Sequence, residues 1–293
     1  MADPPLHQRS GVPSGVARTA LYMSLIRDHE SGRPDALFRD PFSAAVVAEF
    51  TGSRELAELA AGLGTTPDSL SDALGKPEFR YFTIRTRYFD DRLIAAMHQG
   101  IRQVVSLAAG TDGRPMRLDC PAGTRWYELD LPEAVTFKKA LIARTGMAPA
   151  CRWHGVGADL TADWHGPLQQ AGFDPRQPSV WLVEGLLMYL PGEVADRILA
   201  ELTRASAPHS RLLVEHLDTR MMAERGQAIQ DAVKAQNAAL VSARDDIADW
   251  LAGYGWQATV HAGSDPAIGY GRVVPEIPAG WLACATLQGS RRV

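Results

Sequence analysis

An alternation of short apolar runs with helical segments between residues 101 and 215 constrains the fold of this chain more than any other feature. Apolar runs of strand length occur at residues 103–108, 124–129, 151–156, 179–183 and 210–215. Helical patterns separate most of them, at residues 131–144, 163–171 and 192–205. Because parallel strands need a long crossover, which is usually a helix, the alternation predicts a mostly parallel, doubly wound α/β sheet.

The segments on either side of this region have different patterns. Roughly the first hundred residues show helical spacing without a strand candidate, at residues 16–26, 41–50, 54–63 and 80–98. We expect a helical lid over residues 1–100 and a sheet domain over residues 101–293, with one integrated domain as the alternative. After Asp218 we expect helices to residue 239 and over residues 245–252, then an antiparallel edge pair at residues 256–260 and 281–286.

The composition excludes several classes of function. The 293 residues are 46% hydrophobic and 22% charged, which is typical of a soluble globular chain rather than a disordered one. A net charge of −4 gives no basic field that would attract nucleic acid. Three widely spaced cysteines without a metal-ligand pattern predict neither disulfides nor a metal site. The sequence shows neither an export signal nor a membrane span, so we expect a cytoplasmic protein.

The first strand candidate runs into a glycine-containing turn, Ala108-Ala-Gly-Thr-Asp-Gly113, and the acidic residue Asp130 follows Gly110 by 20 positions. That spacing is typical of a nucleotide-binding βαβ unit, in which a carboxylate at the tip of the second strand binds a ribose diol. The turn resembles a degraded Gly-x-Gly-x-x-Gly motif. It therefore predicts an adenosine-containing ligand, and a surface turn of an ordinary α/β protein is the alternative.

The charge of Asp112 in this turn bears on which adenosine cofactor binds. A dinucleotide places its diphosphate at the N-terminus of the following helix, where the Asp112 carboxylate would repel it. S-adenosylmethionine has no phosphate and carries a sulfonium and an ammonium, which acidic side chains suit. We therefore expect S-adenosylmethionine, and an NAD(P)-dependent reductase is the alternative.

Residues beside the other strand candidates complete such a site. Asp159 and Leu160 follow the third strand candidate and are placed to bind adenine, although Asp159 is equally suited to cap a helix. Glu184, before Gly185, ends a central apolar run, and a buried carboxylate there needs either the cofactor ammonium or an internal arginine. The candidates for binding the cofactor carboxylate are arginines that precede the sheet, namely Arg18, Arg85 and Arg87.

Four motifs in this order resemble one enzyme family. They are Arg85-Thr-Arg-Tyr-Phe-Asp-Asp91, Leu107-Ala-Ala-Gly-Thr-Asp-Gly-Arg-Pro-Met-Arg-Leu118, Tyr127-Glu-Leu-Asp-Leu-Pro-Glu133 and Val183-Glu-Gly-Leu-Leu-Met-Tyr-Leu190. Together they are similar to the leucine carboxyl methyltransferases, which are class I S-adenosylmethionine-dependent enzymes with a Rossmann-like fold. The resemblance spans about residues 16–255, and residues 249–256 match the late helix-turn of the family.

The resemblance implies roles for individual residues. Arg85 would bind the cofactor carboxylate, Gly110 with Asp112 would form the cofactor turn, and Asp130 would bind the ribose. Ala108 stands where the family usually has glycine, so we expect a narrower approach to the turn and a lowered affinity. The remaining predicted cofactor-binding residues include those for adenine (Asp159, Leu160) and for the amino-acid group (Glu184), together with Arg18, Ala109, Leu131 and Gly185.

The expected reaction is methyl transfer from the sulfonium to an oxygen by in-line displacement. A carboxylate acceptor, with a pKa of about 4, is ionised at neutral pH and needs no base, whereas a phenol or alcohol does. His216 is the candidate base for that second case, with an ordinary polar strand end as its alternative. Tyr189 is the other catalytic candidate, since with Tyr22 and Met188 it is placed to line an acceptor pocket.

The resemblance also guides the expected partners. The family includes polyketide carboxyl methyltransferases, and 26 arginines against 4 lysines are typical of the GC-rich genomes in which such secondary metabolism abounds. We expect a small-molecule acceptor, no nucleic acid and no membrane as partners, with the oligomeric state left open. A module that keeps the cofactor site without methylating is a further alternative.

Overall fold

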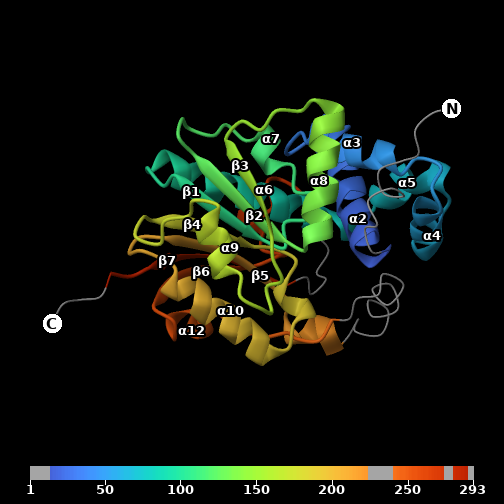
Figure 1. Cartoon of the computed structure of the whole chain (residues 1–293). Helices are drawn as coiled ribbons and strands as arrows, with labels where there is room; N and C mark the ends of the chain where they lie inside the picture. The colour runs from blue at the N-terminus through green and yellow to red at the C-terminus, as the bar shows by residue number, and fades with distance from the viewer. Residues whose placement is uncertain (1–13, 224–239, 274–279, 290–293) are drawn as a thin grey trace.

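A seven-stranded sheet forms the centre of the molecule in the computed structural model, which describes residues 14–223, 240–273 and 280–289 (Figure 1). Side chains are described from Leu21 onward, except that of Glu78. The strands lie in the order β3-β2-β1-β4-β5-β7-β6. Their bounds are β1 Gln103–Leu107, β2 Arg125–Asp130, β3 Arg152–Gly157, β4 Ser179–Val183, β5 Arg211–His216, β6 Trp256–Ala262 and β7 Trp281–Leu287.

The chain winds outward from β1 in both directions. It adds β2 and β3 on one side and then returns to add β4 and β5 on the other, with all five strands parallel. β7 then enters antiparallel to β5 and pairs with β6 at the edge. The prediction of a doubly wound sheet with an antiparallel edge is therefore confirmed. In such sheets ligands bind outside the carboxyl ends of the strands, where the winding reverses, which here is between β1 and β4.

Both faces of the sheet are buried, which explains why the central strands read as continuous apolar runs. Successive side chains of a strand point to opposite faces, so Val104 packs on one side and Val105 on the other. α6 (Arg80–His98) covers the first face. The second face is covered by α9 (His165–Gln170), α10 (Gly192–Arg204) and α12 (Ile247–Ala252) (Figure 1).

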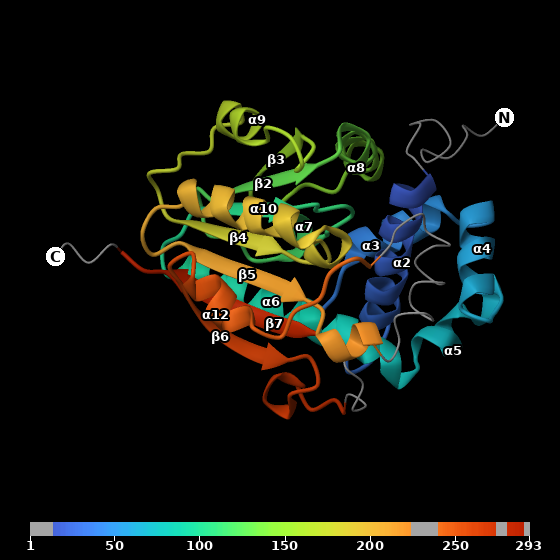
Figure 2. The same ribbon diagram turned by 90° about the horizontal axis from the view of Figure 1, so that it is seen from below.

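The N-terminal helices gather at the carboxyl ends of the strands (Figure 2). They are α2 (Ser14–Ser31), α3 (Pro41–Glu49), α4 (Arg54–Gly62) and α5 (Leu70–Leu74). The side chain of Asp40 caps α3 and that of Ser53 caps α4, each by accepting a backbone N–H of the first turn. Their apolar residues form one cluster with Phe137 and Leu141 of α8 (Pro132–Thr145). The expected lid region thus lies beside the expected ligand site.

The observed elements differ from the predicted ones mainly at their ends and in short segments. α9 begins at His165 rather than residue 163, because the carboxylate of Asp163 accepts the N–H groups of His165 and Gly166. Residues 224–239 of the predicted late helix lie outside the described part of the chain. Short elements that the sequence did not predict are α5, α7 (Arg114–Arg117), η1 (Pro67–Ser69), η2 (Pro77–Phe79), η3 (Leu187–Tyr189) and η4 (Pro266–Ile268).

In the described part of the chain, we find no helix with both the length and the apolar character that crossing a bilayer requires.

Candidate cofactor site

Asp130 joins the turn after β1 to the tip of β2. Its Oδ2 accepts the backbone N–H of Gly110 at 2.6 Å, and its Oδ1 accepts that of Leu131 at 2.7 Å. Burial raises the pKa of Asp130, although these two N–H groups act in the opposite direction. The carboxylate predicted to bind a ribose therefore lies directly beside the predicted cofactor turn, at the carboxyl edge of the sheet.

The turn itself needs two residues in the left-handed region of backbone space. Gly110 has a φ of 51°, which costs a glycine little, and Ala108 also has a φ of 51°. An L-residue with a side chain pays about 1–2 kcal/mol for that conformation. The departure noted in the sequence, alanine in place of glycine, thus falls where the backbone favours glycine most.

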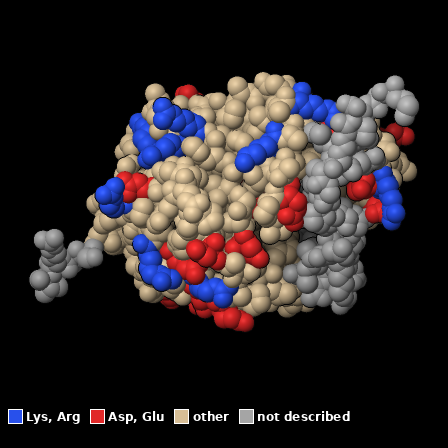
Figure 3. Space-filling view, viewed as in Figure 1, with Lys and Arg blue, Asp and Glu red and all other residues tan. Residues whose placement is uncertain are grey.

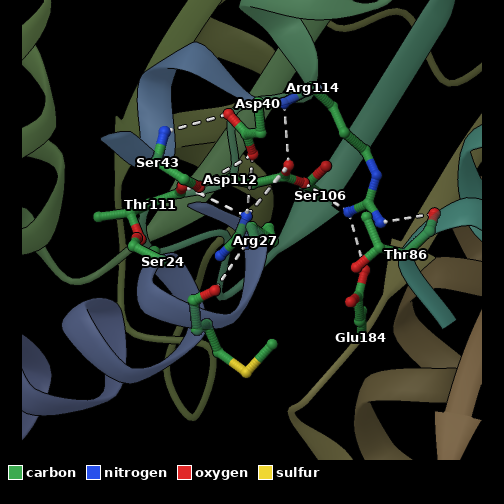
Figure 4. Close-up of polar contacts among 12 residues, drawn as sticks. Ser24, Arg27, Asp40, Ser43, Thr86, Ser106, Thr111, Asp112, Arg114 and Glu184 are labelled. Atoms are coloured by element: carbon green, nitrogen blue, oxygen red, sulfur yellow. Dashed lines mark hydrogen bonds and ion pairs between the residues drawn. The ribbon is translucent and has the colours of Figure 1, made fainter. Parts of the chain in front are cut away.

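Asp112 points away from the turn and into the protein (Figure 4). Its Oδ1 accepts the backbone N–H of Arg114 at 3.0 Å, and its Oδ2 accepts Nη1 of Arg114 at 2.8 Å. Burial alone would raise its pKa, but the charges of Arg114 and Arg27 hold the pKa well below its usual range. The sequence predicts that the Asp112 carboxylate repels a diphosphate. Because these arginines compensate its charge, this reason against a dinucleotide does not hold.

Arg27 fastens α2 to the same turn (Figure 4). Its Nη1 donates to the carbonyl of Thr111 at 3.4 Å and lies 3.8 Å from Asp112 Oδ1. The hydroxyls of Ser24 and Thr111 are hydrogen-bonded at 2.9 Å. The N-terminal helical region therefore contacts the predicted cofactor turn directly.

Glu184 follows β4 and lies between two buried arginines. Its Oε1 is 2.8 Å from Nε of Arg85, and its Oε2 is 2.8 Å from Nη1 of Arg114. Neither Arg85 Nε nor Glu184 Oε2 makes an aligned hydrogen bond within the described residues. The internal-arginine alternative for Glu184 is thus realised, but these polar atoms are still without a well-oriented partner.

Arg85, predicted to bind the cofactor carboxylate, is held by a second acid at the tip of β5. Its Nη1 donates to both carboxylate oxygens of Glu215, each at 2.8 Å. Burial opposes the charge of Arg85, but Glu215 and Glu184 raise its pKa above the usual value. Arg87, the other arginine of that motif, instead pairs with Asp91 at 2.8 Å on the same helix.

The acids and arginines at this edge form one buried network. Among the described residues its members are four arginines and five carboxylates, which leaves a formal charge of −1: Arg27, Arg85, Arg114, Arg117, Asp40, Asp90, Asp112, Glu184 and Glu215. A network with an excess of negative charge favours a ligand with an excess of positive charge. S-adenosylmethionine, with a sulfonium, an ammonium and one carboxylate, is such a ligand.

The residues predicted to bind adenine lie at the next strand tip. Asp159 is exposed, and its Oδ1 accepts both the N–H and the hydroxyl of Thr161 in a local turn, so it does not cap α9, which begins only at His165. Leu160 is buried in the core cluster, whereas Leu131 is 36% exposed. Leu131 and Leu160 are the two leucines predicted to bind the cofactor. Leu131 is therefore the one whose side chain is more available to a planar ring.

The structure separates the two catalytic candidates. His216 ends β5, is buried, and packs its ring edge-on against Trp250 of α12. Adjacent strand residues point to opposite faces, so His216 lies away from the side on which Glu215 meets Arg85. Tyr189 is half-buried in η3, and burial with the nearby Glu215 raises its pKa. Only Tyr189 is thus brought to the ionic network.

Burial gives His216 a measurable effect on stability. Burial and the charge of Arg244 lower its pKa to about 4, against 6.5 for an ordinary histidine. The unfolded ring takes up a proton in this interval and the folded ring does not, so stability rises from pH 4 to 6.5. By linkage we expect a gain of about 3 kcal/mol in the free energy of unfolding. Urea titrations of the wild type and of His216→Gln across this range measure it.

The measured quantity is the difference between the two proteins, because Glu128 acts in the opposite direction. Burial raises the pKa of Glu128 to about 7 despite its pairing with Lys138, so this residue favours folding less as the pH rises above 4.5. Both proteins retain Glu128, and its contribution cancels. Parallel stability curves for the wild type and His216→Gln would contradict a buried, neutral His216.

Several residues of the site were missed by sequence reasoning. Glu215 follows an apolar run at a strand tip, as Glu184 does. The same pattern therefore indicates Glu215, but only the adjacent His216 was predicted. Arg27 and Arg117 carry no local signal, because their partners come from distant segments. Arg114 has Asp112 as a local partner, but its other partners, Asp90 and Glu184, are distant in the sequence. Arg18 lies in α2, and its side chain is outside the described part of the chain.

Comparison with known proteins identifies the family. The leucine carboxyl methyltransferase family model matches residues 20–203. A protein of Mycolicibacterium smegmatis is 38% identical over 272 residues, covering 90% of each chain. A protein of Parafrankia sp. is 44% identical over 220 residues, covering 74% of this chain and 67% of its own. Both carry the name "Putative S-adenosyl-L-methionine-dependent methyltransferase".

Solved structures share the fold. A DUF574 family protein from Streptomyces avermitilis superimposes with a TM-score of 0.54 at 17% identity, covering 80% of this chain and 97% of its own. A protein from Thermobifida fusca, described as a methyltransferase, gives 0.52 at 18% identity, covering 80% and 94%. At this identity the similarity shows a class I methyltransferase fold.

The family match decides between the cofactors considered above. It extends over more than half of the chain, and the relatives are named as S-adenosylmethionine-dependent methyltransferases. The NAD(P)-dependent reductase alternative is therefore not retained. The chain belongs to the leucine carboxyl methyltransferase family and is an S-adenosylmethionine-dependent methyltransferase.

Proposed function

We propose that this enzyme is an O-methyltransferase that methylates the carboxylate of a small apolar molecule, such as a polyketide acid. The observation that carries the proposal is the burial of His216 against Trp250, on the face of β5 opposite Glu215. A phenol or alcohol acceptor needs a base, whereas a carboxylate is already ionised at neutral pH. A site whose candidate base is turned away favours the acceptor that needs none.

The residues at the carboxyl edge fit the cofactor. Asp130 is placed for the ribose, and Glu184 for the ammonium, since its Oε2 is buried without an aligned hydrogen bond. Arg85 is placed for the carboxylate, since its Nη2 donates only to the thioether of Met23, at 3.8 Å, among the described residues. S-adenosylmethionine supplies an activated methyl group when bound. These residues would hold it at the ribose and at the amino-acid group.

The protein's contribution to the reaction is alignment and exclusion of water. In-line displacement needs the acceptor oxygen opposite the departing sulfur, and holding both reactants in that geometry is a large share of the rate enhancement. Aromatic and sulfur-containing side chains surround Arg85, with Tyr22 edge-on to Phe82 and the thioether of Met23 beside the guanidinium. Such a surface suits an apolar acceptor and excludes water from the reacting carboxylate.

The surface supports a small-molecule partner rather than a nucleic acid. On the face shown in Figure 3, basic side chains of the described residues stand in small groups, several of them next to acidic ones, and form no continuous basic band. The chain has a net charge of −4. We propose a cytoplasmic enzyme that acts on a free metabolite.

A pair of acceptors with one carbon skeleton tests the proposal. An aromatic acid and the corresponding phenol are incubated separately with the enzyme and S-adenosylmethionine, and methylated products are measured by mass spectrometry. We expect methyl ester from the acid, at a rate that is flat from about pH 6 to 9, because a group of pKa about 4 stays ionised there. Methylation of the phenol alone, rising about tenfold per pH unit toward its pKa of about 10, would establish the hydroxyl alternative. Tight cofactor binding without either product would favour a non-methylating role.

A further inference from the structure

Glu215 is the most completely satisfied carboxylate of the ionic network. Its side chain is 1% exposed at the tip of β5. Its Oε1 accepts the Tyr81 hydroxyl at 2.7 Å and Arg85 Nη1 at 2.8 Å. Its Oε2 accepts the same Nη1 and the backbone N–H of Gly185, each at 2.8 Å. Four hydrogen bonds from three residues, two of them in α6 and one after β4, therefore fix one carboxylate beside the site.

These contacts determine how Arg85 presents its donors. Nη1 is taken by Glu215 and Nε lies against Glu184, so the guanidinium cannot rotate without losing both acids. The remaining nitrogen, Nη2, faces α2 and makes no hydrogen bond to an oxygen of the described residues, only one to the thioether of Met23 at 3.8 Å. A thioether is a weak acceptor. Carboxylates thus hold Arg85 through Nη1 and Nε, whereas Nη2 has only a weak acceptor among the described residues.

The same carboxylate controls the backbone beside Glu184. Gly185 has a φ of 66°, a left-handed conformation, and its N–H is the one that Glu215 accepts. This hydrogen bond sets the direction in which the chain leaves β4, and with it the position of the Glu184 carboxylate. Glu215 therefore contacts Arg85 directly and contacts the backbone next to Glu184, the two residues that would hold the amino-acid end of the cofactor.

We propose that Glu215 is a positioning residue that orients Arg85 Nη2 toward the α-carboxylate of the cofactor and holds Glu184 for its ammonium. The inference rests on the cofactor placement in the proposed function. Glu215 acts through Arg85 and the Gly185 backbone and does not itself touch the cofactor. Its loss weakens recognition of the amino-acid end and leaves recognition of the adenosine end unchanged.

Two ligands that differ only at that end test this role. S-adenosylhomocysteine carries the amino acid, and 5′-methylthioadenosine lacks it. Calorimetry on Glu215→Gln is expected to show a loss of about 10- to 100-fold in affinity for S-adenosylhomocysteine, the range for losing charge-assisted hydrogen bonds. The affinity for methylthioadenosine should stay within about twofold of the wild type. Glu193→Gln, an exposed acid of α10, is the matched control and should leave both affinities unchanged.

A double-mutant cycle separates positioning from general structural damage. In an Arg85→Lys background the guanidinium fork is absent, so adding Glu215→Gln should lower the affinity for S-adenosylhomocysteine by a smaller factor than it does in the wild type, because only the route through the Gly185 backbone remains. Equal losses for both ligands, or additive losses in the cycle, would overturn the proposal. Tyr81→Phe, which removes one hydrogen bond to Glu215, provides a milder variant with the same expected selectivity should Glu215→Gln not fold.

The wild type distinguishes this inference from the proposed function. If it bound methylthioadenosine and S-adenosylhomocysteine equally well, recognition of the amino-acid end would be refuted and the methylation proposal would stand. If it bound neither ligand, the cofactor placement would be wrong and the inference would be overturned with it.

Discussion

Replacement of Arg114 by methionine is expected to lower the free energy of unfolding by about 3–5 kcal/mol, the range measured when one partner of a buried ion pair is removed. Arg114 is 3% exposed and lies within 2.8 Å of Asp90, Asp112 and Glu184. Methionine fills similar space without the charge, so carboxylates remain buried with fewer cations. Chemical denaturation at pH 7, followed by circular dichroism, measures the effect.

An exposed arginine with the same kind of partner provides the matched control. Arg176 is paired with Asp174 at 2.9 Å, but its side chain is 87% exposed. Exposed pairs contribute little because water screens them, so Arg176→Met should leave the free energy of unfolding close to that of the wild type. If both variants lost a similar amount of unfolding free energy, burial would not determine how much the ion pairs of Arg114 contribute to stability.

Asp130→Ala is expected to weaken binding of S-adenosylhomocysteine by about 30- to 150-fold, which corresponds to about 2–3 kcal/mol for hydrogen bonds to a charged acceptor. The substitution removes the carboxylate placed for the ribose diol. It also leaves the N–H groups of Gly110 and Leu131 without their side-chain acceptor, so the turn loses one of its hydrogen bonds to β2. Isothermal titration calorimetry measures the affinity.

Asp249→Ala serves as its control, because Asp249 is an exposed acid of α12, a helix that packs on β6 and β7. It should bind S-adenosylhomocysteine like the wild type. Because Asp130 contacts the ribose side, Asp130→Ala should also weaken methylthioadenosine, unlike Glu215→Gln. Unchanged affinity of Asp130→Ala for both ligands would refute the placement of the ribose.

The sheet was predictable because each strand and helix leaves a local pattern. The run Val104-Val105 and the run Val180-Trp-Leu-Val183 are apolar on both faces, as buried parallel strands are, and helical segments of crossover length separate the strands. The ends of elements were less predictable. The short helix α7 begins at Arg114, directly after Gly113. No periodic pattern marks it, and the ion pairs of Arg114 fix its position.

The sequence predicted a site residue more readily when one strand tip fixes its position than when contacts with several segments do. Asp130 was selected because its distance from Gly110 along the chain is fixed by the geometry of one βαβ unit. Asp112 was predicted to be a charge facing the ligand, but it is turned inward, where it contacts Arg114 two residues later in the chain and Arg27 from the distant helix α2. His216 was selected by its strand-end position, but the pleat directs it toward Trp250.

The sequence by itself determined the mostly parallel, doubly wound sheet and two of the acids at the strand tips, Asp130 and Glu184. These follow from period, spacing and chain length, which act over a few tens of residues. Only the tertiary structure decided which arginine meets which acid and which donors of Arg85 stay open. That pairing depends on α2, α6 and α7 converging on the tips of β4 and β5, because a buried charge is compensated by whichever opposite charge folding brings within contact distance.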